Sequence, residues 1–382
     1  MKRSLASFDV VIVGSGFFGL TMAHQIATES DKKVVVIEKR DHIGGNSHSE
    51  NYGSSGIEVH KYGSHLFHTS SLEVWQFINQ FSSFNEYTHQ VKSLYRGEYF
   101  DIPINLHTLS QFFHRPFSPS EARDFMKSQK NNFSAQKALT FEDHAIQTVG
   151  LDLYEAFYKG YTKKQWQLDP SLLPGEIFSR IPIRLNFDSR YFDDTFQGLP
   201  ILGYHKVFEK MIENPSIEVL TGTDFFQLGF TRGEEQLVVF TGPIDRYFNY
   251  RLGLLNWRTL DFEWSIENTN DFQGNSVINY PEEQYPFTRI HEFKHLHPER
   301  VEKMKSNQTV IAKEFSRFAD VGDEPFYPVN SPRDKILLRG YRDLAKREKG
   351  VFFGGRLGRY QYLDMHMAIA AALSLFDKIN EA

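Results

Sequence analysis

The chain has 382 residues, with 43 Lys and Arg, 48 Asp and Glu, 35 Phe, 18 Tyr and 4 Trp, and it has no Cys. The formal charge of −5 disfavours a nucleic-acid partner, because such proteins bind phosphate backbones through excess positive charge. The absence of Cys excludes thiol nucleophiles, disulfide frameworks, Cys-ligated zinc and iron–sulfur clusters, and it fits a reducing cytoplasm. The length exceeds the ~250–300 residues at which single cores stop growing, so we expect two or more packed units.

No apolar stretch reaches the ~18–20 residues that a membrane span requires. The longest candidate, residues 365–376, is shorter and carries His366 and Ser374. The apolar run at residues 10–13 ends at glycines, which predicts a buried strand rather than a signal peptide. We therefore expect a soluble, cytoplasmic protein.

The N-terminal segment has the pattern of a strand, a glycine turn, a helix and a second strand. These pieces are residues 8–13, Gly14-Ser15-Gly16-Phe17-Phe18-Gly19, residues 20 to about 30, and residues 33–37. This order predicts the opening βαβ unit of a doubly wound, Rossmann-like sheet.

The spacing Gly14-x-Gly16-x-x-Gly19 is typical of a turn that binds a pyrophosphate through backbone N–H groups. Glu38 stands at the end of the second strand, where a carboxylate accepts the ribose hydroxyls of an adenosine and disfavours a 2′-phosphate. FAD or NAD is therefore favoured over NADP. The second glycine pair, Gly44-Gly45, favours FAD, whose pyrophosphate and ribityl chain need close backbone approach. A structural glycine turn beside a surface glutamate is the alternative.

The rest of the chain alternates between helical and strand-like composition. Helices are expected at residues 109 to about 174, and strands at residues 181–190, 236–240 and 272–289. Residues 350–356 predict one more parallel strand with a glycine turn, and residues 364–379 an apolar helix. The predicted fold is α/β, with an FAD-binding domain of residues 1–80, 198–245 and 335–382, a helical insert of residues 106–176, and an antiparallel sheet domain of residues 81–105, 177–197 and 246–334.

His291-Glu292-Phe293-Lys294-His295 has the H-E-x-x-H spacing that places two zinc-binding imidazoles on one helical face. The surrounding prolines, β-branched residues and aromatic residues predict a strand instead. On a strand these imidazoles lie ~13 Å apart, at ~3.3 Å per residue, which is too far to share one ion. A zinc peptidase is a remote alternative, and no metal site is expected.

Three histidines, His60, His65 and His68, occur close together in the sequence. A lone histidine is more often structural than catalytic. His65 is the best candidate of the three, because it follows Gly63-Ser64, where the backbone can approach a flat cofactor.

Eight separated blocks of sequence carry the strongest functional signal. They are Gly14 to Gly19, Arg40 to Asn46, Tyr62 to Thr69, Tyr161-Thr162-Lys163-Lys164-Gln165-Trp166, Arg180-Ile181-Pro182-Ile183-Arg184, Tyr191-Phe192, Thr241-Gly242-Pro243-Ile244-Asp245, and Gly355 to Met365. In this order they closely resemble the bacterial UDP-galactopyranose mutase family.

The resemblance implies an isomerase that interconverts UDP-galactopyranose and UDP-galactofuranose with reduced FAD. In the implied mechanism N5 of the reduced flavin attacks the anomeric carbon and displaces UDP, forming a covalent adduct. The sugar ring then opens and recloses through O4 instead of O5, and UDP returns, so the reaction is redox neutral. The resemblance also implies a homodimer, NAD(P)H or another reductant, and a role in cell-wall biosynthesis.

The resemblance also assigns residues to roles. Arg180 and Arg356 are expected to clamp the diphosphate, His65 to approach N5, and Trp166 to stack on uracil within the helical insert. The implied cofactor-binding residues are Gly14, Ser15, Gly16, Phe17, Phe18, Gly19, Glu38, Lys39, Arg40, Gly45, Asn46, His65, Leu66, Arg356, Tyr362, Leu363, Asp364 and Met365. The implied substrate-binding residues are His89, Phe157, Tyr161, Trp166, Arg180, Tyr191, Arg258, Asn279, Arg289, Tyr327, Arg356 and Tyr362.

Two departures from the family pattern concern the pocket. His89 stands where many relatives carry an asparagine, and Gly253-Leu254-Leu255-Asn256 replaces a Gly-Arg-Leu-Gly segment, so one expected arginine is missing. The alternative functions are an FAD-dependent oxidoreductase of the amine-oxidase type and a noncatalytic module that binds FAD or a UDP-sugar.

Overall fold

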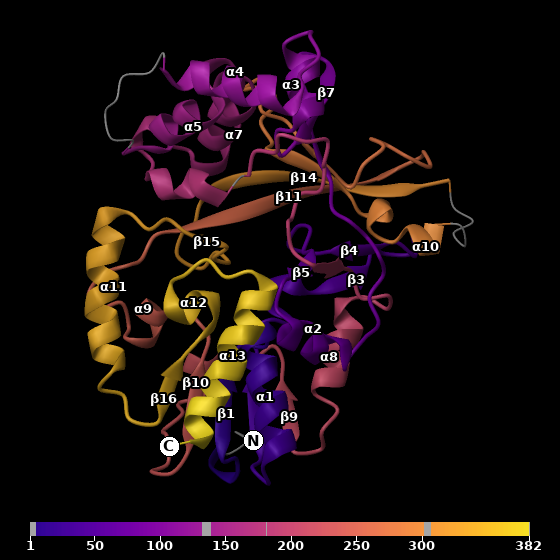
Figure 1. The fold of residues 1–382 in the computed structure, drawn as a ribbon. Helices are drawn as coiled ribbons and strands as arrows, with labels where there is room; N and C mark the ends of the chain where they lie inside the picture. Colours follow the sequence, from indigo (N-terminus) through magenta and orange to yellow (C-terminus); the bar gives the residue numbers. More distant parts are fainter. Residues whose placement is uncertain (1–4, 132–138, 181, 302–306, 382) are drawn as a thin grey trace.

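The structure is a computed structural model that describes residues 5–131, 139–180, 182–301 and 307–381. Its two large sheets lie in different parts of the molecule (Figure 1). A parallel sheet lies near both termini, and a longer mixed sheet separates it from a group of helices at the top of the view.

The parallel sheet has five strands. In spatial order they are β16 (Val351–Phe353), β10 (Leu237–Phe240), β1 (Val10–Val13), β2 (Val34–Ile37) and β9 (Ile217–Leu220). All neighbouring pairs are parallel, which confirms the predicted βαβ start and the late strand near residue 351. The chain passes from β1 to β2 on one side and later adds β10 on the other. Ligands of doubly wound sheets bind at the carboxyl ends of strands where the order reverses in this way.

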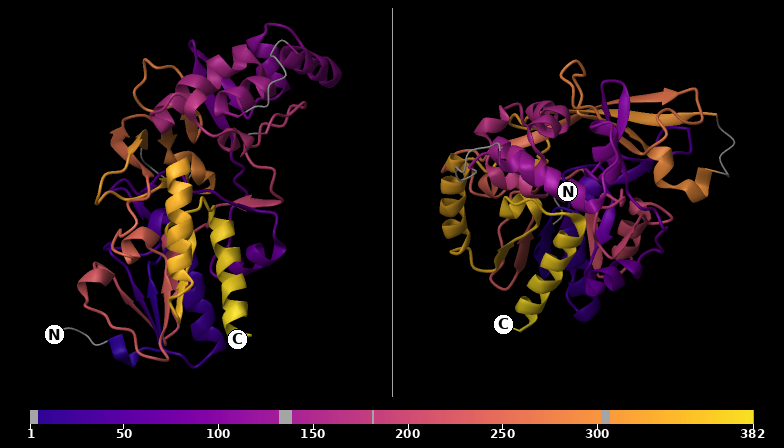
Figure 2. Two further views of the ribbon diagram at one scale, coloured as in Figure 1. Left: turned by 90° about the vertical axis from the view of Figure 1, so that its left-hand side faces the viewer. Right: turned by 45° about the horizontal axis from the view of Figure 1, so that its top comes forward.

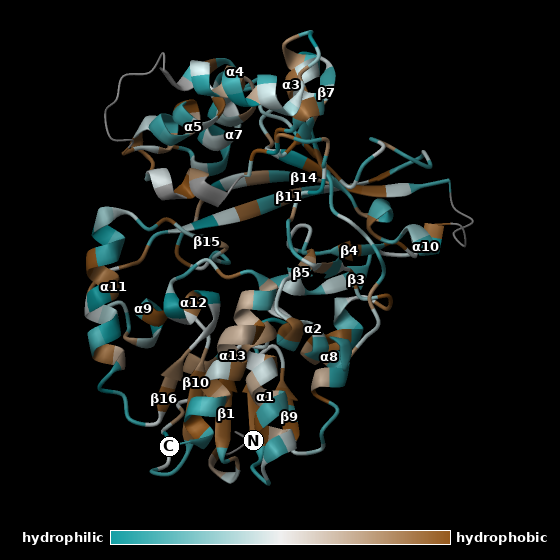
Figure 3. Ribbon diagram, in the orientation of Figure 1, coloured by the Kyte–Doolittle hydropathy of each residue, from teal (hydrophilic) through white to brown (hydrophobic). Residues whose placement is uncertain are grey.

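Successive residues of these strands are buried on opposite faces of the sheet. Val10 and Ile12 pack with helices α1 (Phe17–Glu29) and α13 (Met365–Asn380), whereas Val11 and Val13 pack on the other face with Phe225. Burial on both faces explains why the strands are continuous apolar runs, which are coloured brown in Figure 3.

The mixed sheet has seven strands. In spatial order they are β15 (Tyr327–Pro328), β11 (Trp257–Glu267), β14 (Thr309–Phe318), β13 (Arg289–Glu292), β12 (Val277–Asn279), β6 (Val91–Tyr95) and β7 (Glu98–Ile102). All neighbouring pairs are antiparallel except β12 and β6, so the expectation of a purely antiparallel sheet is wrong at this pair. These two strands are far apart in the sequence, and no hairpin turn imposes an antiparallel direction on them.

The helical group between β7 and residue 172 has its own apolar core, which includes Leu109, Phe141, Ile146 and Phe157. Its elements are α3 (Leu106–Phe112), α4 (Pro119–Asn131), α5 (Phe141–Val149), α6 (Leu151–Leu153), the π-helix η3 (Tyr154–Lys159), α7 (Gly160–Trp166) and η4 (Pro170–Leu172). In the left view of Figure 2 this group again lies at the end of the molecule away from both termini.

The remaining elements connect these layers. They are η1 (Leu5–Ser7), η2 (Gly45–Ser47), β3 (Ser49–Asn51), β4 (Glu58–His60), β5 (Phe67–Thr69), α2 (Leu72–Asn79), η5 (Gly175–Arg180), β8 (Phe196–Gly198), α8 (Tyr204–Met211), η6 (Phe225–Gln227), α9 (Ile244–Tyr247), η7 (Phe293–Leu296), α10 (Pro298–Val301), α11 (Pro332–Ala345) and α12 (Gly355–Arg359). Among the described residues, no helix combines the length and the apolar character that a membrane span requires.

Two predicted strand segments are different in the structure. Residues 182–190 contain no strand, because local bonds replace a strand ladder: Asp188 N–H donates to Asn186 Oδ1, and Arg190 N–H donates to Asp188 Oδ1. Ile181 lies outside the described residues. Within the segment 272–289, only β12 and the first residue of β13 are in strands.

Candidate functional site

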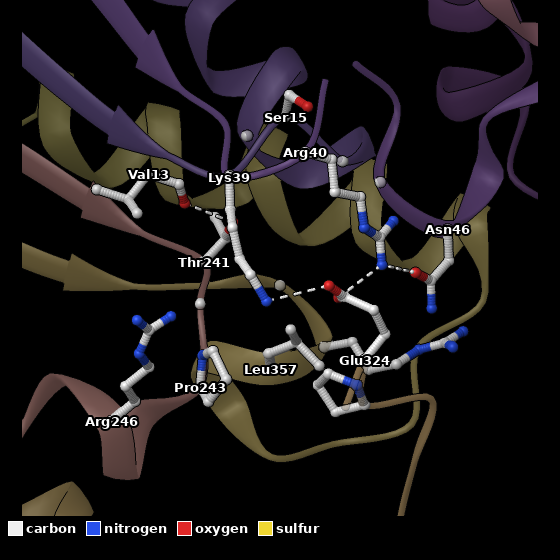
Figure 4. A pocket seen from close by; sticks show the side chains of 18 of the residues that line it. Val13, Ser15, Lys39, Arg40, Asn46, Thr241, Pro243, Arg246, Glu324 and Leu357 are labelled. Carbon is white, nitrogen blue, oxygen red and sulfur yellow. Dashed lines mark hydrogen bonds and ion pairs between the residues drawn. The ribbon is translucent and has the colours of Figure 1, made fainter. Parts of the chain in front are cut away.

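Cavity A, of about 820 Å³, lies at the carboxyl ends of β1, β2 and β10. Its lining includes Val13, Ser15 and Thr241, which are labelled in Figure 4. Glu38 and the glycine turn that opens α1 also line it. It therefore occupies the position where a doubly wound sheet binds a dinucleotide.

Each of the three glycines of the first turn is explained by a different physical reason. A Cβ on Gly14, whose φ is +99°, would lie 2.1 Å from Thr241 Oγ1, and a Cβ on Gly19 would lie 2.1 Å from the Gly14 carbonyl oxygen. A Cβ on Gly16 would meet no protein atom within 4 Å. The protein itself requires glycine at positions 14 and 19, whereas the space beside Gly16 is available for a bound molecule that needs close backbone approach.

Glu38 is held at the end of β2 by three donors. Its Oε2 accepts from the N–H of Ser15 at 2.9 Å and from the Ser15 hydroxyl at 2.6 Å, and its Oε1 accepts from the N–H of Arg40 at 2.9 Å. The Gly44 N–H donates to the Ser15 carbonyl oxygen at 2.9 Å, which brings the second glycine pair against the first turn. Both glycine motifs and the acid therefore converge on cavity A.

Glu324, which no sequence motif singled out, pairs with two basic residues of this cavity. Arg40 Nη2 donates to Glu324 Oε2 at 2.8 Å and to Asn46 Oδ1 at 2.8 Å, and Lys39 Nζ lies 3.1 Å from Glu324 Oε1 (Figure 4). Burial opposes ionisation of Glu324, but Arg40 and Lys39 outweigh it and lower the pKa of this carboxyl.

Most of the predicted cofactor residues line cavity A. They are Gly14, Ser15, Gly16, Phe17, Phe18, Gly19, Glu38, Lys39, Arg40, Gly45, Asn46, His65, Arg356, Leu363, Asp364 and Met365. Leu66 and Tyr362 line the second cavity instead. The altered segment at residues 253–256 contributes Leu254, Leu255 and Asn256 to cavity A.

Cavity B, of about 440 Å³, is lined by residues of the mixed sheet, of η3 and α7, and of the segments around His65 and Arg356. Ten predicted substrate residues line it: His89, Phe157, Tyr161, Trp166, Tyr191, Asn279, Arg289, Tyr327, Arg356 and Tyr362. Four residues, His65, Arg356, Asp364 and Met365, line both cavities. The two cavities are therefore neighbours that share one wall.

Arg289 belongs to a buried network on the wall of cavity B. Its Nε lies 3.3 Å from Glu314 Oε1, and its Nη2 donates to the Tyr161 hydroxyl. His291 Nε2 donates to Glu314 Oε2 at 3.0 Å, and the Ser64 hydroxyl is 2.8 Å from His291 Nδ1. Burial opposes the charge of Glu314, but Arg289 and His291 outweigh it and lower its pKa to about 2. The network joins α7 to the loop that carries His65.

Arg356, on α12, stands where the cavities meet. Its Nη2 donates to the Leu363 carbonyl at 2.6 Å and its Nη1 to the Phe326 carbonyl at 3.2 Å. Its Cζ lies 5.0 Å from the ring centroid of Tyr362 and 5.8 Å from that of Tyr327. Its hydrogen bonds go to neutral carbonyls, which leave the positive charge available to an anion.

His65 is held as a neutral imidazole. Burial lowers its pKa to about 4, and its Nδ1 donates to the Gly63 carbonyl at 2.7 Å. This bond places the proton on Nδ1 and leaves Nε2 as a hydrogen-bond acceptor.

The two other predicted arginines differ from Arg289 and Arg356. Arg258 lines neither cavity: its Nε donates to the Gln165 carbonyl at 3.1 Å and its Nη2 to the Ser316 hydroxyl at 3.1 Å, so it fastens the end of α7 to the sheet. Arg180 is the last residue of η5, and its side chain lies outside the described part of the chain.

Two polar side chains of cavity B have unusual surroundings. Burial lowers the pKa of His89 to about 3, so this ring is neutral, and its Nδ1 is 3.1 Å from the Tyr87 hydroxyl. The buried Tyr158 hydroxyl has no hydrogen-bond partner within the described structure. Tyr158 matches no sequence motif, but it lines the cavity beside Phe157, and both residues lie on the π-helix η3.

The H-E-x-x-H segment spans the end of β13 and η7. His291 turns toward Glu314, whereas His295 Nε2 lies 3.1 Å from Asp271 Oδ1 and 3.3 Å from Glu292 Oε2. The described residues thus bring Glu292 and His295 together with Asp271 and not with His291. This arrangement contradicts the peptidase alternative.

Comparisons with known proteins agree with this geometry. A family model described as UDP-galactopyranose mutase matches residues 156–362, and one described as an NAD(P)-binding Rossmann-like domain matches residues 12–81. A Klebsiella pneumoniae protein described as a probable UDP-galactopyranose mutase is 41% identical over 371 residues, which cover 97% of this chain and 94% of that protein. A dTDP-fucopyranose mutase of Escherichia coli is 39% identical over 368 residues, which cover 95% of this chain and 96% of that protein.

Solved structures share the fold. A crystal structure of reduced UDP-galactopyranose mutase aligns with a TM-score of 0.72 at 15% identity, over 98% of this chain and 96% of that one. A putrescine oxidase aligns with a TM-score of 0.56 at 13% identity, over 98% of this chain and 99% of that one. The oxidase likeness shows that the architecture extends beyond mutases.

Proposed function

The chain belongs to the UDP-galactopyranose mutase family, and from that premise we propose that it interconverts UDP-galactopyranose and UDP-galactofuranose with reduced FAD. The observation that carries the proposal is the shared wall of the two cavities. A dinucleotide in cavity A and a nucleotide sugar in cavity B would meet at His65 and Arg356.

Cavity A fits FAD. Glu38 stands at the strand end that receives an adenosine ribose, and the open space beside Gly16 suits a pyrophosphate bound by backbone N–H groups. When bound, reduced FAD supplies the nucleophile of the reaction at its N5, which explains how a chain without Cys performs covalent catalysis. Asp364 and Met365, at the start of α13, reach both cavities and would support the end of the cofactor that faces the sugar.

Cavity B fits a nucleoside diphosphate sugar. Arg289 and Arg356 line this cavity and would donate hydrogen bonds to the diphosphate, and the stacked rings of Tyr327 and Tyr362 lie beside Arg356. Trp166 offers a flat face for the base. The predicted diphosphate clamp pairs Arg356 with Arg180.

The reaction requires the residues of cavity B to hold UDP while it is not bonded to the anomeric carbon of the sugar. The bond between the anomeric carbon and the UDP oxygen breaks and later reforms, and the ring oxygen changes from O5 to O4. The overall composition and oxidation state stay the same. The guanidinium of Arg356 would stabilise the charge that develops on the departing diphosphate, and neutral His65 would present Nε2 as an acceptor beside the sugar.

A dTDP-6-deoxyhexose is the second candidate substrate, because the dTDP-fucopyranose mutase is almost as similar to this chain as the probable UDP-galactopyranose mutase. The same residues would serve either diphosphate. The homodimer, the nicotinamide reductant, the cytoplasmic location and the role in cell-wall biosynthesis stay predictions of the family resemblance.

The decisive experiment incubates the purified, FAD-loaded protein with UDP-galactofuranose or dTDP-fucofuranose, with and without dithionite, and separates ring forms by chromatography. Conversion of the UDP-sugar in the reduced state alone supports the proposal. Conversion restricted to the dTDP-sugar would reassign the substrate. Oxygen consumption with amines and no sugar conversion would favour the oxidoreductase alternative.

A further inference from the structure

Lys164, on α7, has an unusual set of partners. Its ammonium Nζ lies within hydrogen-bond distance of four carbonyl oxygens of the segment between β12 and β13: those of Tyr280 at 2.5 Å, Glu282 at 2.9 Å, Tyr285 at 2.9 Å and Phe287 at 3.0 Å. Its three N–H groups are thus shared among four acceptors. We call residues 280–287 the carbonyl segment. One side chain of α7 thus organises almost the whole of this connection.

The same contact is supported from α7 by Gly160. A Cβ at this position would lie 2.3 Å from the Pro281 carbonyl oxygen, so the helix and the carbonyl segment approach as closely as glycine allows. Neighbouring Lys163 also reaches the segment, but it pairs with Glu283 at the surface, where both side chains are more than half exposed to solvent. The half-buried part of the contact therefore depends on Lys164 and Gly160.

Both sides of this contact carry residues of cavity B. Helix α7 supplies Tyr161 and Trp166, and the strands at the two ends of the carbonyl segment supply Asn279 and Arg289. Asn279 and Arg289 are paired across β12 and β13, and Arg289 donates to the Tyr161 hydroxyl. A displacement of α7 from the segment would therefore change the distance between the aromatic face and the arginine.

We propose that Lys164 is a positioning residue for the nucleotide: by holding α7 against the carbonyl segment, it sets where Trp166 and Tyr161 stand relative to Arg289. The proposal rests on the proposed function, since it assumes that cavity B holds a nucleoside diphosphate sugar. Lys164 lines neither cavity, so it acts through α7 and not by contact with the ligand. Its loss should weaken nucleotide binding much more than it slows turnover of bound substrate.

The test compares Lys164→Met with Lys163→Met. Both variants lose one positive charge from α7 beside the same segment. Only Lys164→Met removes the donor that the four carbonyl oxygens share. Small displacements of positioning groups cost up to ~100-fold, so we expect Lys164→Met to raise the KM for UDP-galactofuranose and the Kd for UDP by about 10-fold or more. Its kcat should stay within about 3-fold of wild type, and Lys163→Met should leave KM and Kd within about 2-fold.

A second variant keeps the test decisive if Lys164→Met does not fold. Gly160→Ala keeps the lysine but pushes α7 away from the Pro281 carbonyl, and the helical backbone at this position accepts alanine. It should show the same rise in KM with little change in kcat. Flavin absorbance and far-ultraviolet circular dichroism check that each variant is folded and loaded with FAD.

The outcomes separate the two hypotheses. If wild-type protein converts the sugar and binds UDP, but Lys164→Met and Gly160→Ala keep normal KM and Kd values, the positioning role is overturned. An equal rise in KM and Kd in Lys163→Met would also overturn it. The positive charge of α7, and not the hydrogen bonds of Lys164 to the carbonyl segment, would then be responsible. If wild-type protein neither converts the sugar nor binds UDP, the proposed function itself fails.

Discussion

Arg289 Nε lies 3.3 Å from Glu314 Oε1 on the wall of cavity B, and both residues belong to adjacent, directly paired positions of β13 and β14. The carboxylate supplies a counterion to this half-buried arginine. Because Arg289 also donates to Tyr161, the pair fixes the guanidinium in a definite orientation before any ligand arrives.

The Arg289–Glu314 pair predicts a specific dependence of stability on pH. The folded-state pKa of Glu314 is about 2, below its ordinary value of 4.5, so its ionised form stabilises the fold above pH 4.5, and this contribution is lost as the pH falls from there toward 2. Between pH 5.5 and 4, wild type should lose about 0.8 kcal/mol of unfolding free energy through this group, and Glu314→Gln should lack that loss. Urea unfolding of both proteins at the two pH values measures the difference. If the unfolding free energy of both proteins depended on pH in the same way, Arg289 would not lower the pKa of Glu314.

Arg356 should be intolerant even of lysine. Arg356→Lys keeps the charge but loses the planar group that donates to two carbonyls and lies beside the stacked rings of Tyr327 and Tyr362. We expect kcat/KM for UDP-galactofuranose to fall about 100-fold or more, as for other arginines that stabilise a departing anion. Arg359→Lys, at the exposed end of the same helix, is the matched control and should stay within about 2-fold of wild type. A near-normal Arg356→Lys enzyme would remove this residue from the diphosphate site.

Two alanine substitutions in the glycine turn should have different effects, one on cofactor binding and the other on folding. Gly16→Ala places a methyl group in open space, on a residue with an extended backbone. The unfolding free energy of the apoprotein should therefore stay within about 1 kcal/mol of wild type. Bound FAD should nevertheless fall strongly, because the methyl group occupies the approach to the pyrophosphate. Gly19→Ala should destabilise the apoprotein itself, since its Cβ would meet the Gly14 carbonyl. Flavin content after purification and apoprotein urea unfolding distinguish the two; full flavin content in Gly16→Ala would contradict the predicted binding mode.

Removal of the Tyr158 hydroxyl should stabilise the free protein. A buried hydroxyl without a partner costs ~1–3 kcal/mol, so Tyr158→Phe should raise the unfolding free energy by about 1 kcal/mol. Tyr154→Phe is the matched control from the same π-helix: its hydroxyl donates to Glu142 Oε1 at 3.0 Å, and its removal should lower the unfolding free energy by about 1 kcal/mol. Equal destabilisation of both variants would show that Tyr158 has a partner in the folded chain.

Much of cavity A could be predicted from sequence, because its key parts lie within forty consecutive residues. The β-branched runs, the glycine spacing and Glu38 form one local βαβ unit, and the structure places them as that unit requires. Glu324 could not be predicted, since nothing in its neighbourhood indicates that it meets Arg40 more than 280 residues away.

By itself the sequence determined most of the local elements, the residue types of the chemistry and, through its eight blocks, the family. Only the tertiary structure decided which of these residues share a space. It placed Arg258 behind α7 instead of in cavity B, gave Arg289 its partner Glu314, and closed four carbonyls around Lys164. The physical reason is the distance along the chain over which each interaction acts. Periodicity and turn chemistry act over a few residues. The charge, burial and orientation of a site residue depend instead on strands and helices that are far apart in the sequence.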